Sequence, residues 1–172
     1  CVFRNNSAAE RGGAVGIYGA GKVRFSLFVG NDAGALGGAV YSEHLGTGEC
    51  DSCTFADNKV NGSTSAEASG VSGENVTVRD CLFYNCKCEA DLDGSYVVTE
   101  NPFVDPAGGN YLIKPDVLKS IPGNADRGNA YAAAETLDLV GNPVLRPPFF
   151  VAGCYAPVLN LQSFIDVTPE GG

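Results

Sequence analysis

The segment Cys1-Val-Phe-Arg-Asn-Asn6, followed by Gly12-Gly-Ala-Val15, recurs along the chain and decides its fold. Both halves return as Ser26-Leu-Phe-Val-Gly-Asn31 and Gly37-Gly-Ala-Val40. The first half returns twice more, as Cys53-Thr-Phe-Ala-Asp-Asn58 and Cys81-Leu-Phe-Tyr-Asn-Cys86. The copies are about 25 to 28 residues apart, and a repeat of this size cannot bury an apolar face alone. The sequence therefore predicts a stack of similar turns.

Within each copy the inward-facing candidates alternate with other residues, as Cys81 and Phe83 do, and this alternation is typical of short strands. We expect an all-β parallel β-helix (a β-solenoid) with one repeat per turn, so that equivalent residues lie above one another. These columns are an inward stack of Phe3, Phe28, Phe55 and Phe83, an asparagine ladder of Asn6, Asn31 and Asn58, and glycine bends at Gly12-Gly13 and Gly37-Gly38.

The pairing of Phe-x-x-Asn with Gly-Gly-Ala-Val resembles the double motif of the polymorphic-outer-membrane-protein repeats. The matching pairs are Phe3/Asn6, Phe28/Asn31 and Phe55/Asn58, together with the two Gly-Gly-Ala-Val segments. Repeats of this family form right-handed parallel β-helix passengers of bacterial surface proteins. The resemblance therefore implies a right-handed helix of turns in a secreted or cell-surface protein.

The repeats also predict how the chain is divided. Residues 1–100 are expected to form the β-helix turns, truncated on the N-terminal side because Cys1 already lies inside a motif copy. Residues 157–172 are expected to form a last strand or a linker to a following module. Between them, residues 101–156 resemble the irregular C-terminal cap of secreted bacterial β-helix proteins, through Phe103, Asp105, Tyr111, Asp138 and Gly141-Asn-Pro143.

Composition excludes some classes of partner. The chain has 172 residues, a formal net charge of −9 and a pI of about 4.4. It is long enough for one domain with a substantial core. An acidic chain is not expected to bind nucleic acid or an anionic membrane surface through a basic patch. The sequence has no apolar run of about 18 residues, so we expect no membrane insertion by this segment.

The seven cysteines have three possible roles. Cys50 and Cys53 stand at stacking positions, so small, apolar, inward-facing thiols are the simplest interpretation. Alternatively, Cys50 and Cys53 form half of a zinc site, with Cys81, Cys86 and Cys88 supplying the other half at an unusual spacing. Disulfides are a third arrangement open to an exported protein.

Residues 89–100 nearly match the calcium-binding loop of an EF-hand. Asp91, Asp93 and Glu100 stand in register with the oxygen ligands of such a loop. However, the flanking sequence does not predict the two helices of an EF-hand, so an acidic surface turn is the alternative. The sequence predicts no other cofactor.

Three sequons begin at Asn5, Asn61 and Asn75, and they are candidate glycosylation sites if the source is eukaryotic. The only histidine, His44, stands beside Glu43 in a polar connection and is expected to be a solvated side chain. Nothing near it in the sequence forms a Ser-His-Asp or Cys-His arrangement.

Two classes of function fit these observations. The first is a non-catalytic extracellular or cell-surface module, adhesin-like or structural, whose partner is a surface glycan, a protein or neighbouring copies. A plain spacer belongs to the same class. The alternative is a carbohydrate-active enzyme, a polysaccharide lyase or glycosidase, whose catalytic turns are partly missing from this chain. The expected outward columns hold no pair of carboxylates of the kind a glycosidase needs, so enzyme activity stays open and is not favoured.

Overall fold

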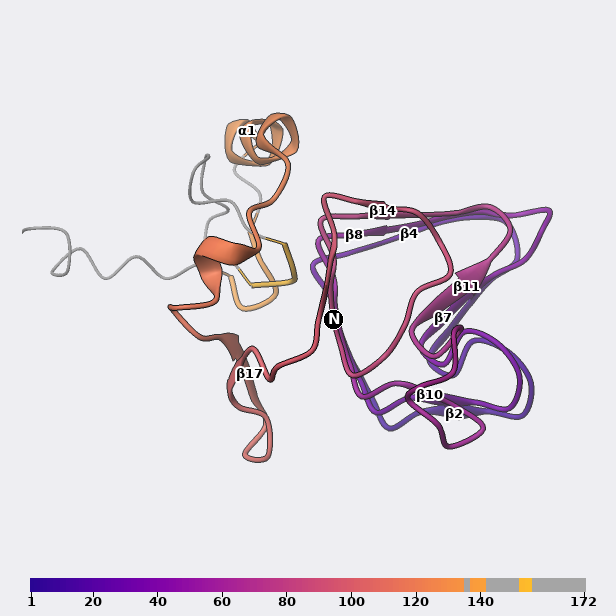
Figure 1. Ribbon diagram of the computed structural model, residues 1–172. Helices are drawn as coiled ribbons and strands as arrows, with labels where there is room; N and C mark the ends of the chain where they lie inside the picture. Colours follow the sequence, from indigo (N-terminus) through magenta and orange to yellow (C-terminus); the bar gives the residue numbers. More distant parts are fainter. Residues whose placement is uncertain (135–136, 142–151, 156–172) are drawn as a thin grey trace, which may run out of the picture.

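The computed structural model describes residues 1–134, 137–141 and 152–155, which form a stack of short parallel strands beside a smaller irregular segment (Figure 1). We number the parallel sheets I to IV in chain order. Sheet I contains β1 (Val2–Arg4), β5 (Leu27–Val29), β9 (Thr54–Ala56), β13 (Leu82–Tyr84) and β15 (Tyr96–Val98). Sheet II contains β2 (Ser7–Ala8), β6 (Asp32–Ala33) and β10 (Lys59–Val60).

The chain then passes through the other two sheets before it returns to sheet I. Sheet III contains β3 (Val15–Ile17), β7 (Val40–Ser42) and β11 (Val71–Gly73). Sheet IV contains β4 (Ala20–Arg24), β8 (Thr47–Asp51), β12 (Val76–Arg79) and β14 (Leu92–Asp93). In Figure 1 the successive turns overlie one another, with β4, β8 and β14 along one side and β7 and β11 along another. The predicted parallel β-solenoid is confirmed.

The register of sheet I explains the repeated phenylalanine. Phe3, Phe28, Phe55 and Phe83 pair in sequence across β1, β5, β9 and β13, all pointing inward. Their rings are stacked with centroids 4.7, 4.8 and 4.7 Å apart. Because that separation equals the spacing between neighbouring strands, the backbone ladder itself brings the rings into contact. The predicted aromatic column therefore forms the centre of the core.

The predicted asparagine ladder is also present. Asn6 Nδ2 donates to Asn31 Oδ1, and Asn31 Nδ2 donates to Asn58 Oδ1, each at 2.9 Å. Asn31 and Asn58 also donate to the carbonyl oxygens of Phe3 and Phe28. Both asparagines are fully buried, so these bonds satisfy amides that would otherwise be costly to desolvate. The ladder ends where Cys86 takes the place of a fourth asparagine.

The repeated glycines are required by close backbone contacts. A Cβ at Gly13 would lie 2.1 Å from the carbonyl oxygen of Gly38, and one at Gly38 would lie 2.1 Å from that of Lys59. Neighbouring turns therefore approach at this bend to a distance that excludes any side chain.

Cys50 and Cys53 lie in the interior as the simplest interpretation predicts, together with Cys81 and Cys86. Cys50, Cys53 and Cys81 are completely buried, Cys86 is 3 % exposed, and all seven cysteines are free. Burial raises the pKa of the Cys86 thiol to about 12 and that of Cys88 to about 11. In the described part of the chain, no three His, Cys, Asp or Glu side chains are grouped so as to hold a metal ion. The inward, apolar role of these thiols is confirmed.

The last circuit is shorter than the others. Asparagine-ladder partners are 25 and 27 residues apart, whereas Cys81 contacts its counterpart Ser95 only 14 residues later. This circuit pairs in sheets I and IV, through β15 and β14. Its inward side chains are Leu92 and Val97, which are 40 % and 50 % exposed. The stack therefore ends at this layer among the described residues.

The segment expected to be a cap lies along one flank of the stack. It contains an antiparallel pair, β16 (Phe103–Asp105) and β17 (Asn110–Ile113), the short η1 (Leu118–Ser120) and α1 (Ala125–Ala133). Figure 1 shows β17 and α1 outside the stacked turns, on the side opposite β7 and β11. We call the described part of this segment, residues 101–134, 137–141 and 152–155, the strap.

The strap lies there because the outer face of sheet I is apolar. Leu27, Val29, Ala56 and Leu82 occupy outward positions and form one buried cluster with Phe103, Tyr111, Ile113, Ile121, Ala152 and Cys154. The strap therefore lies along the side of sheet I, and the division of the chain at residue 100 stays a prediction. The predicted last strand or linker at 157–172 lies outside the described residues.

Candidate functional site

The candidate calcium ligands are dispersed around the last circuit. Asp93 ends β14, and its carboxylate accepts a hydrogen bond from Arg127 Nη1 at 2.9 Å and lies 3.8 Å from Arg79 Nε. Asp91 and Glu100 are exposed. Two guanidinium groups thus face the carboxylate that a cation would need. The calcium site stays a prediction, and Asp93 takes part in an ion-pair network in this structure.

The three sequon asparagines are exposed. Asn5 and Asn61 stand at bends with positive φ, of 53° and 50°. The Asn75 amide nitrogen donates to the carbonyl oxygen of His44, which joins two connections of neighbouring turns. Glycosylation at these positions stays a prediction.

Sheet IV carries a charged outer face on which the sign alternates from strand to strand. Lys22 and Arg24 of β4 face Glu49 and Asp51 of β8, which are followed by Arg79 of β12 and Asp93 of β14. Lys22 Nζ lies 2.7 Å from Glu49 and 3.2 Å from Asp51. Parallel in-register strands bring equivalent side chains together, so alternation replaces like-charge repulsion with attraction.

The two carboxylates of β8 on this face are paired with cations. The hydrogen bond from Lys22 lowers the pKa of Glu49, and the charges of Lys22, Arg79 and Arg24 act in the same direction against desolvation. Asp51 is almost completely buried and shares Lys22 with Glu49. The alternation is therefore best explained as stabilisation of the stack.

A different cluster of side chains occupies the outer face of sheet III. The outward positions there are Gly16, Tyr41 and Ser72, which pair across β3, β7 and β11. The Tyr18 ring lies against Gly16, because a Cβ at that glycine would be 3.0 Å from its Cε2 atom. Tyr18 is 71 % exposed. The missing side chain at Gly16 thus leaves space for an aromatic ring at the surface.

Polar groups beside Tyr41 form a connected network. Arg11 Nη1 donates to the Tyr41 hydroxyl at 3.0 Å and lies 3.6 Å from a Glu43 carboxylate oxygen. The other carboxylate oxygen of Glu43 lies 3.0 Å from His44 Nδ1. The hydrogen bond with His44 lowers the pKa of Glu43, and the Arg11 charge adds to this effect. Next to His44, Leu45 is 81 % exposed.

We call Arg11, Tyr18, Tyr41, Glu43, His44 and Leu45 the tyrosine patch. It combines two exposed apolar side chains with a guanidinium, a carboxylate and an imidazole that already hold one another in place. Tyrosine and arginine are the residue types that dominate the energetics of protein–protein contacts, and a tyrosine ring with adjacent donors also suits a sugar. The patch therefore combines features that suit a contact with a protein or a sugar.

Sequence reasoning identified part of this patch. His44 was expected to be a solvated side chain, and it is exposed, although it is joined to Glu43. The sequence did not single out Tyr18, Arg11 or Leu45, because none of them stands at a position that recurs in the other repeats. One signal was available, namely that Tyr18 follows the Gly-Gly-Ala-Val segment at a point where the chain must bend.

Comparison with known proteins agrees with the repeat reading. Residues 1–18 match the family model described as Chlamydia polymorphic membrane protein (Chlamydia_PMP) repeat. The searches of curated proteins and of solved structures returned no match. In the described part of the chain, no helix has the length and apolar character needed to cross a membrane. The matched residues form β1, β2 and β3, so the chain contains a polymorphic-membrane-protein-type repeat that folds as one turn of a parallel β-solenoid.

Proposed function

We propose that this chain is a non-catalytic module of a surface-exposed protein and that it makes adhesive contacts. The observation that carries the proposal is the match of residues 1–18 to a polymorphic-membrane-protein repeat. The family name refers to membrane proteins of Chlamydia, and an outer-membrane or cell-surface location follows from that likeness. The rigid stack, with sheets III and IV facing outward, is consistent with a module that presents a surface to a partner.

The tyrosine patch is the contact surface that the geometry favours. Tyr18 and Leu45 expose their apolar side chains at adjacent bends, and no described residue covers them. Arg11 and Glu43 are already paired, so a partner meets oriented donors and acceptors rather than flexible chains. Pre-organisation of this kind reduces the entropy lost on binding. The partner is a surface glycan or a protein.

The carbohydrate-active alternative has less support. Glu49 and Asp51 are the neighbouring carboxylates on the charged face, and both are paired with Lys22. These ion pairs join neighbouring turns, so stabilisation of the stack explains the carboxylates without a catalytic role. We therefore retain the binding module as the function.

The test is a binding screen of the purified chain against acidic and neutral polysaccharides and against cell-surface extracts, with and without Ca²⁺. A double variant, Tyr18→Ala with Leu45→Ala, removes the exposed apolar side chains of the patch. Val104→Ala is the control, because Val104 is an exposed apolar residue on β16, outside the patch, with 51 % exposure.

We expect the double variant to lose binding by roughly tenfold or more, as loss of an aromatic anchor does, while the control binds normally. Equal loss in both variants, or none in either, would contradict a contact through the patch. Cleavage of any polysaccharide would overturn the non-catalytic reading.

A further inference from the structure

The strap covers a face that a solenoid would otherwise expose. Leu27, Ala56 and Leu82 are outward residues of sheet I, and each is at most 2 % exposed because the strap lies on them. Phe103 contacts the Tyr84 ring edge-on at 5.7 Å and the Tyr111 ring at 5.0 Å. The guanidinium of Arg4 lies over the Tyr111 ring. The β16–β17 end of the strap is therefore held by apolar and aromatic contacts.

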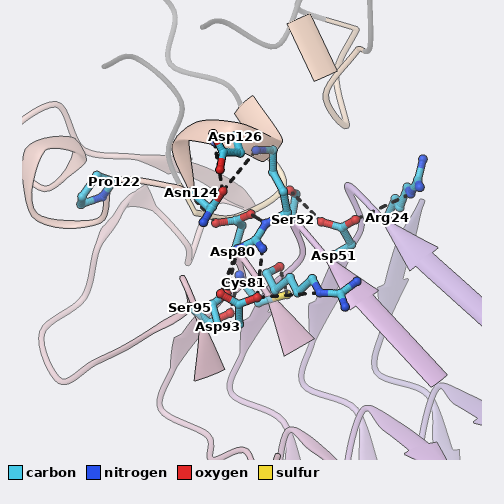
Figure 2. Close-up of polar contacts among 12 residues, drawn as sticks. Arg24, Asp51, Ser52, Asp80, Cys81, Asp93, Ser95, Pro122, Asn124 and Asp126 are labelled. Atoms are coloured by element: carbon cyan, nitrogen blue, oxygen red, sulfur yellow. Dashed lines mark hydrogen bonds and ion pairs between the residues drawn. The ribbon is translucent and has the colours of Figure 1, made fainter. Parts of the chain in front are cut away.

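The other end of the strap is held by three residues of the solenoid. Thr54 Oγ1 accepts the N–H of Cys154 at 3.0 Å, and the Tyr96 hydroxyl donates to the carbonyl oxygen of Pro122 at 3.0 Å. The third residue is Asp80. Asp80 accepts hydrogen bonds from the backbone N–H of Asn124 at 2.7 Å and from Arg127 Nε through its two carboxylate oxygens. Its carbonyl oxygen accepts the N–H of Gly153 at 2.8 Å. Figure 2 shows Asp80 between Asn124 on the strap and Asp93 on the solenoid. Three points of the strap thus converge on one side chain and its backbone.

Arg127 extends this attachment to the last strand of sheet IV. Its Nη1 and Nη2 atoms donate to the two carboxylate oxygens of Asp93, at 2.9 and 3.3 Å. Asn124 Oδ1 accepts the N–H groups of Asp126 and Arg127 and so caps the start of α1. The fork of the guanidinium, the helix cap and the buried carboxylate therefore form one connected unit, which we call the latch.

The solenoid itself does not require a carboxylate at position 80. The bend before each sheet I strand is made by Phe25, Ser52, Asp80 and Gly94, with φ of 41°, 51°, 47° and 65°. Four different side chains thus make the same bend in successive turns. Asp80 is completely buried, and burial raises the pKa of its carboxyl while the bonds from Arg127 and Asn124 act in the opposite direction. Because other residue types make this bend in the other turns, the bend does not explain a buried aspartate at position 80. Its contacts with the strap do.

We propose that Asp80 and Arg127 form the latch of a releasable helix, α1. Loss of the carboxylate–guanidinium contact frees α1 from the solenoid, while the stacked turns stay folded. The rest of the strap stays on the outer face of sheet I, because Phe103, Tyr111 and Ile113 pack against that face without the latch. The strap thus has one part, α1, that the latch holds and another part that an apolar cluster holds.

Hydrogen–deuterium exchange on the full chain tests the latch. Asp80→Ser removes the carboxylate and introduces the residue type that makes the equivalent bend at position 52. Arg127→Ala removes the other partner from α1, outside the solenoid, and so keeps the test available if Asp80→Ser fails to fold. Lys87→Ala is the control, because Lys87 forms an exposed ion pair with Glu67 within the solenoid.

We expect amides of α1 (Ala125–Ala133) to exchange about tenfold faster or more in both latch variants, as local opening does. Amides of β5, β9 and the asparagine ladder should keep their rates, and the control should match the parent chain. Unchanged α1 amides in both variants would overturn the proposal. Equal acceleration in α1 and the solenoid would also overturn it, because α1 would then be an integral part of the core.

Discussion

The solenoid and the strap bury similar side chains in very different ways. In the solenoid, each inward residue contacts its own equivalent one turn away, as the four stacked phenylalanines do. In the strap, Phe103 and Tyr111 contact unlike residues, and Asp80 and Arg127 meet across 47 residues of chain. The first kind of contact follows from the backbone ladder once a period is set. The second kind depends on residues that occur once, so a single change can release it.

The most damaging change should be one in the centre of the aromatic column. Phe55→Ala removes a completely buried ring that stacks on Phe28 and Phe83, and we expect a loss of about 3–5 kcal/mol in the free energy of unfolding. Chemical denaturation monitored by circular dichroism measures it. Phe103→Ala in the strap sharpens the comparison, since its effect on exchange should be confined to the strap. A loss below about 1 kcal/mol for Phe55→Ala would contradict the stacked core.

Alkaline pH should weaken the solenoid through its buried thiols. The pKa of Cys86 is raised from 9.0 to about 12, and that of Cys88 to about 11. A raised pKa stabilises the fold fully below pH 9, and this contribution is lost as pH rises towards the folded-state values. At pH 11 the loss at Cys86 reaches roughly 3 kcal/mol, at about 1.4 kcal/mol per pH unit above pH 9.

Unfolding measured from pH 8 to 11 provides the check. Cys86→Ala should make the free energy of unfolding less dependent on pH, because it removes the thiol with the larger pKa shift of the two. A curve as steep in the variant as in the parent chain would show that other groups cause the alkaline loss.

The asparagine ladder should show a smaller effect. Asn58→Ala leaves the buried N–H and amide of Asn31 without the oxygen that accepts both, and each unsatisfied group costs about 1–3 kcal/mol. Asn6→Ala is the comparison, because Asn6 is exposed at the first turn. Denaturant midpoints of the two variants should differ clearly. Equal midpoints would mean that the ladder adds nothing beyond local bends.

The charged face of sheet IV should matter least. Lys22→Ala removes contacts with Glu49 and Asp51, and the exposed part of that pairing is worth about 0.2–1 kcal/mol. The effect should shrink in about 1 M salt, where charges are screened within about 3 Å. A loss as large as that of Phe55→Ala would mean that this face, rather than the core, holds the turns together.

The repeat was predictable because its motif occurs several times in the chain. Each Phe-x-x-Asn copy supports the others, and strand spacing converts the period into stacked rings and amides. The latch was not predictable in this way. Nothing near Asp80 in the sequence distinguishes it from the Ser52 of the preceding turn, and its partner Arg127 lies on a helix that the sequence reading expected to be irregular cap. Tyr18 was not predictable either, because its position against Gly16 is a contact between two unlike residues.

The amino-acid sequence by itself determined the parallel stack, the inward phenylalanine and cysteine columns, the asparagine ladder and the kinship of its first turn with polymorphic-membrane-protein repeats. Only the tertiary structure decided that residues 101–134 cover a flank of the stack, that Asp80 receives Arg127, and that Arg11, Tyr18 and Glu43 share one surface. The physical reason is that a period specifies contacts between equivalent residues through the backbone. Contacts between unlike residues, such as those between the strap and the solenoid, depend on the shape and charge of individual side chains, which no period specifies.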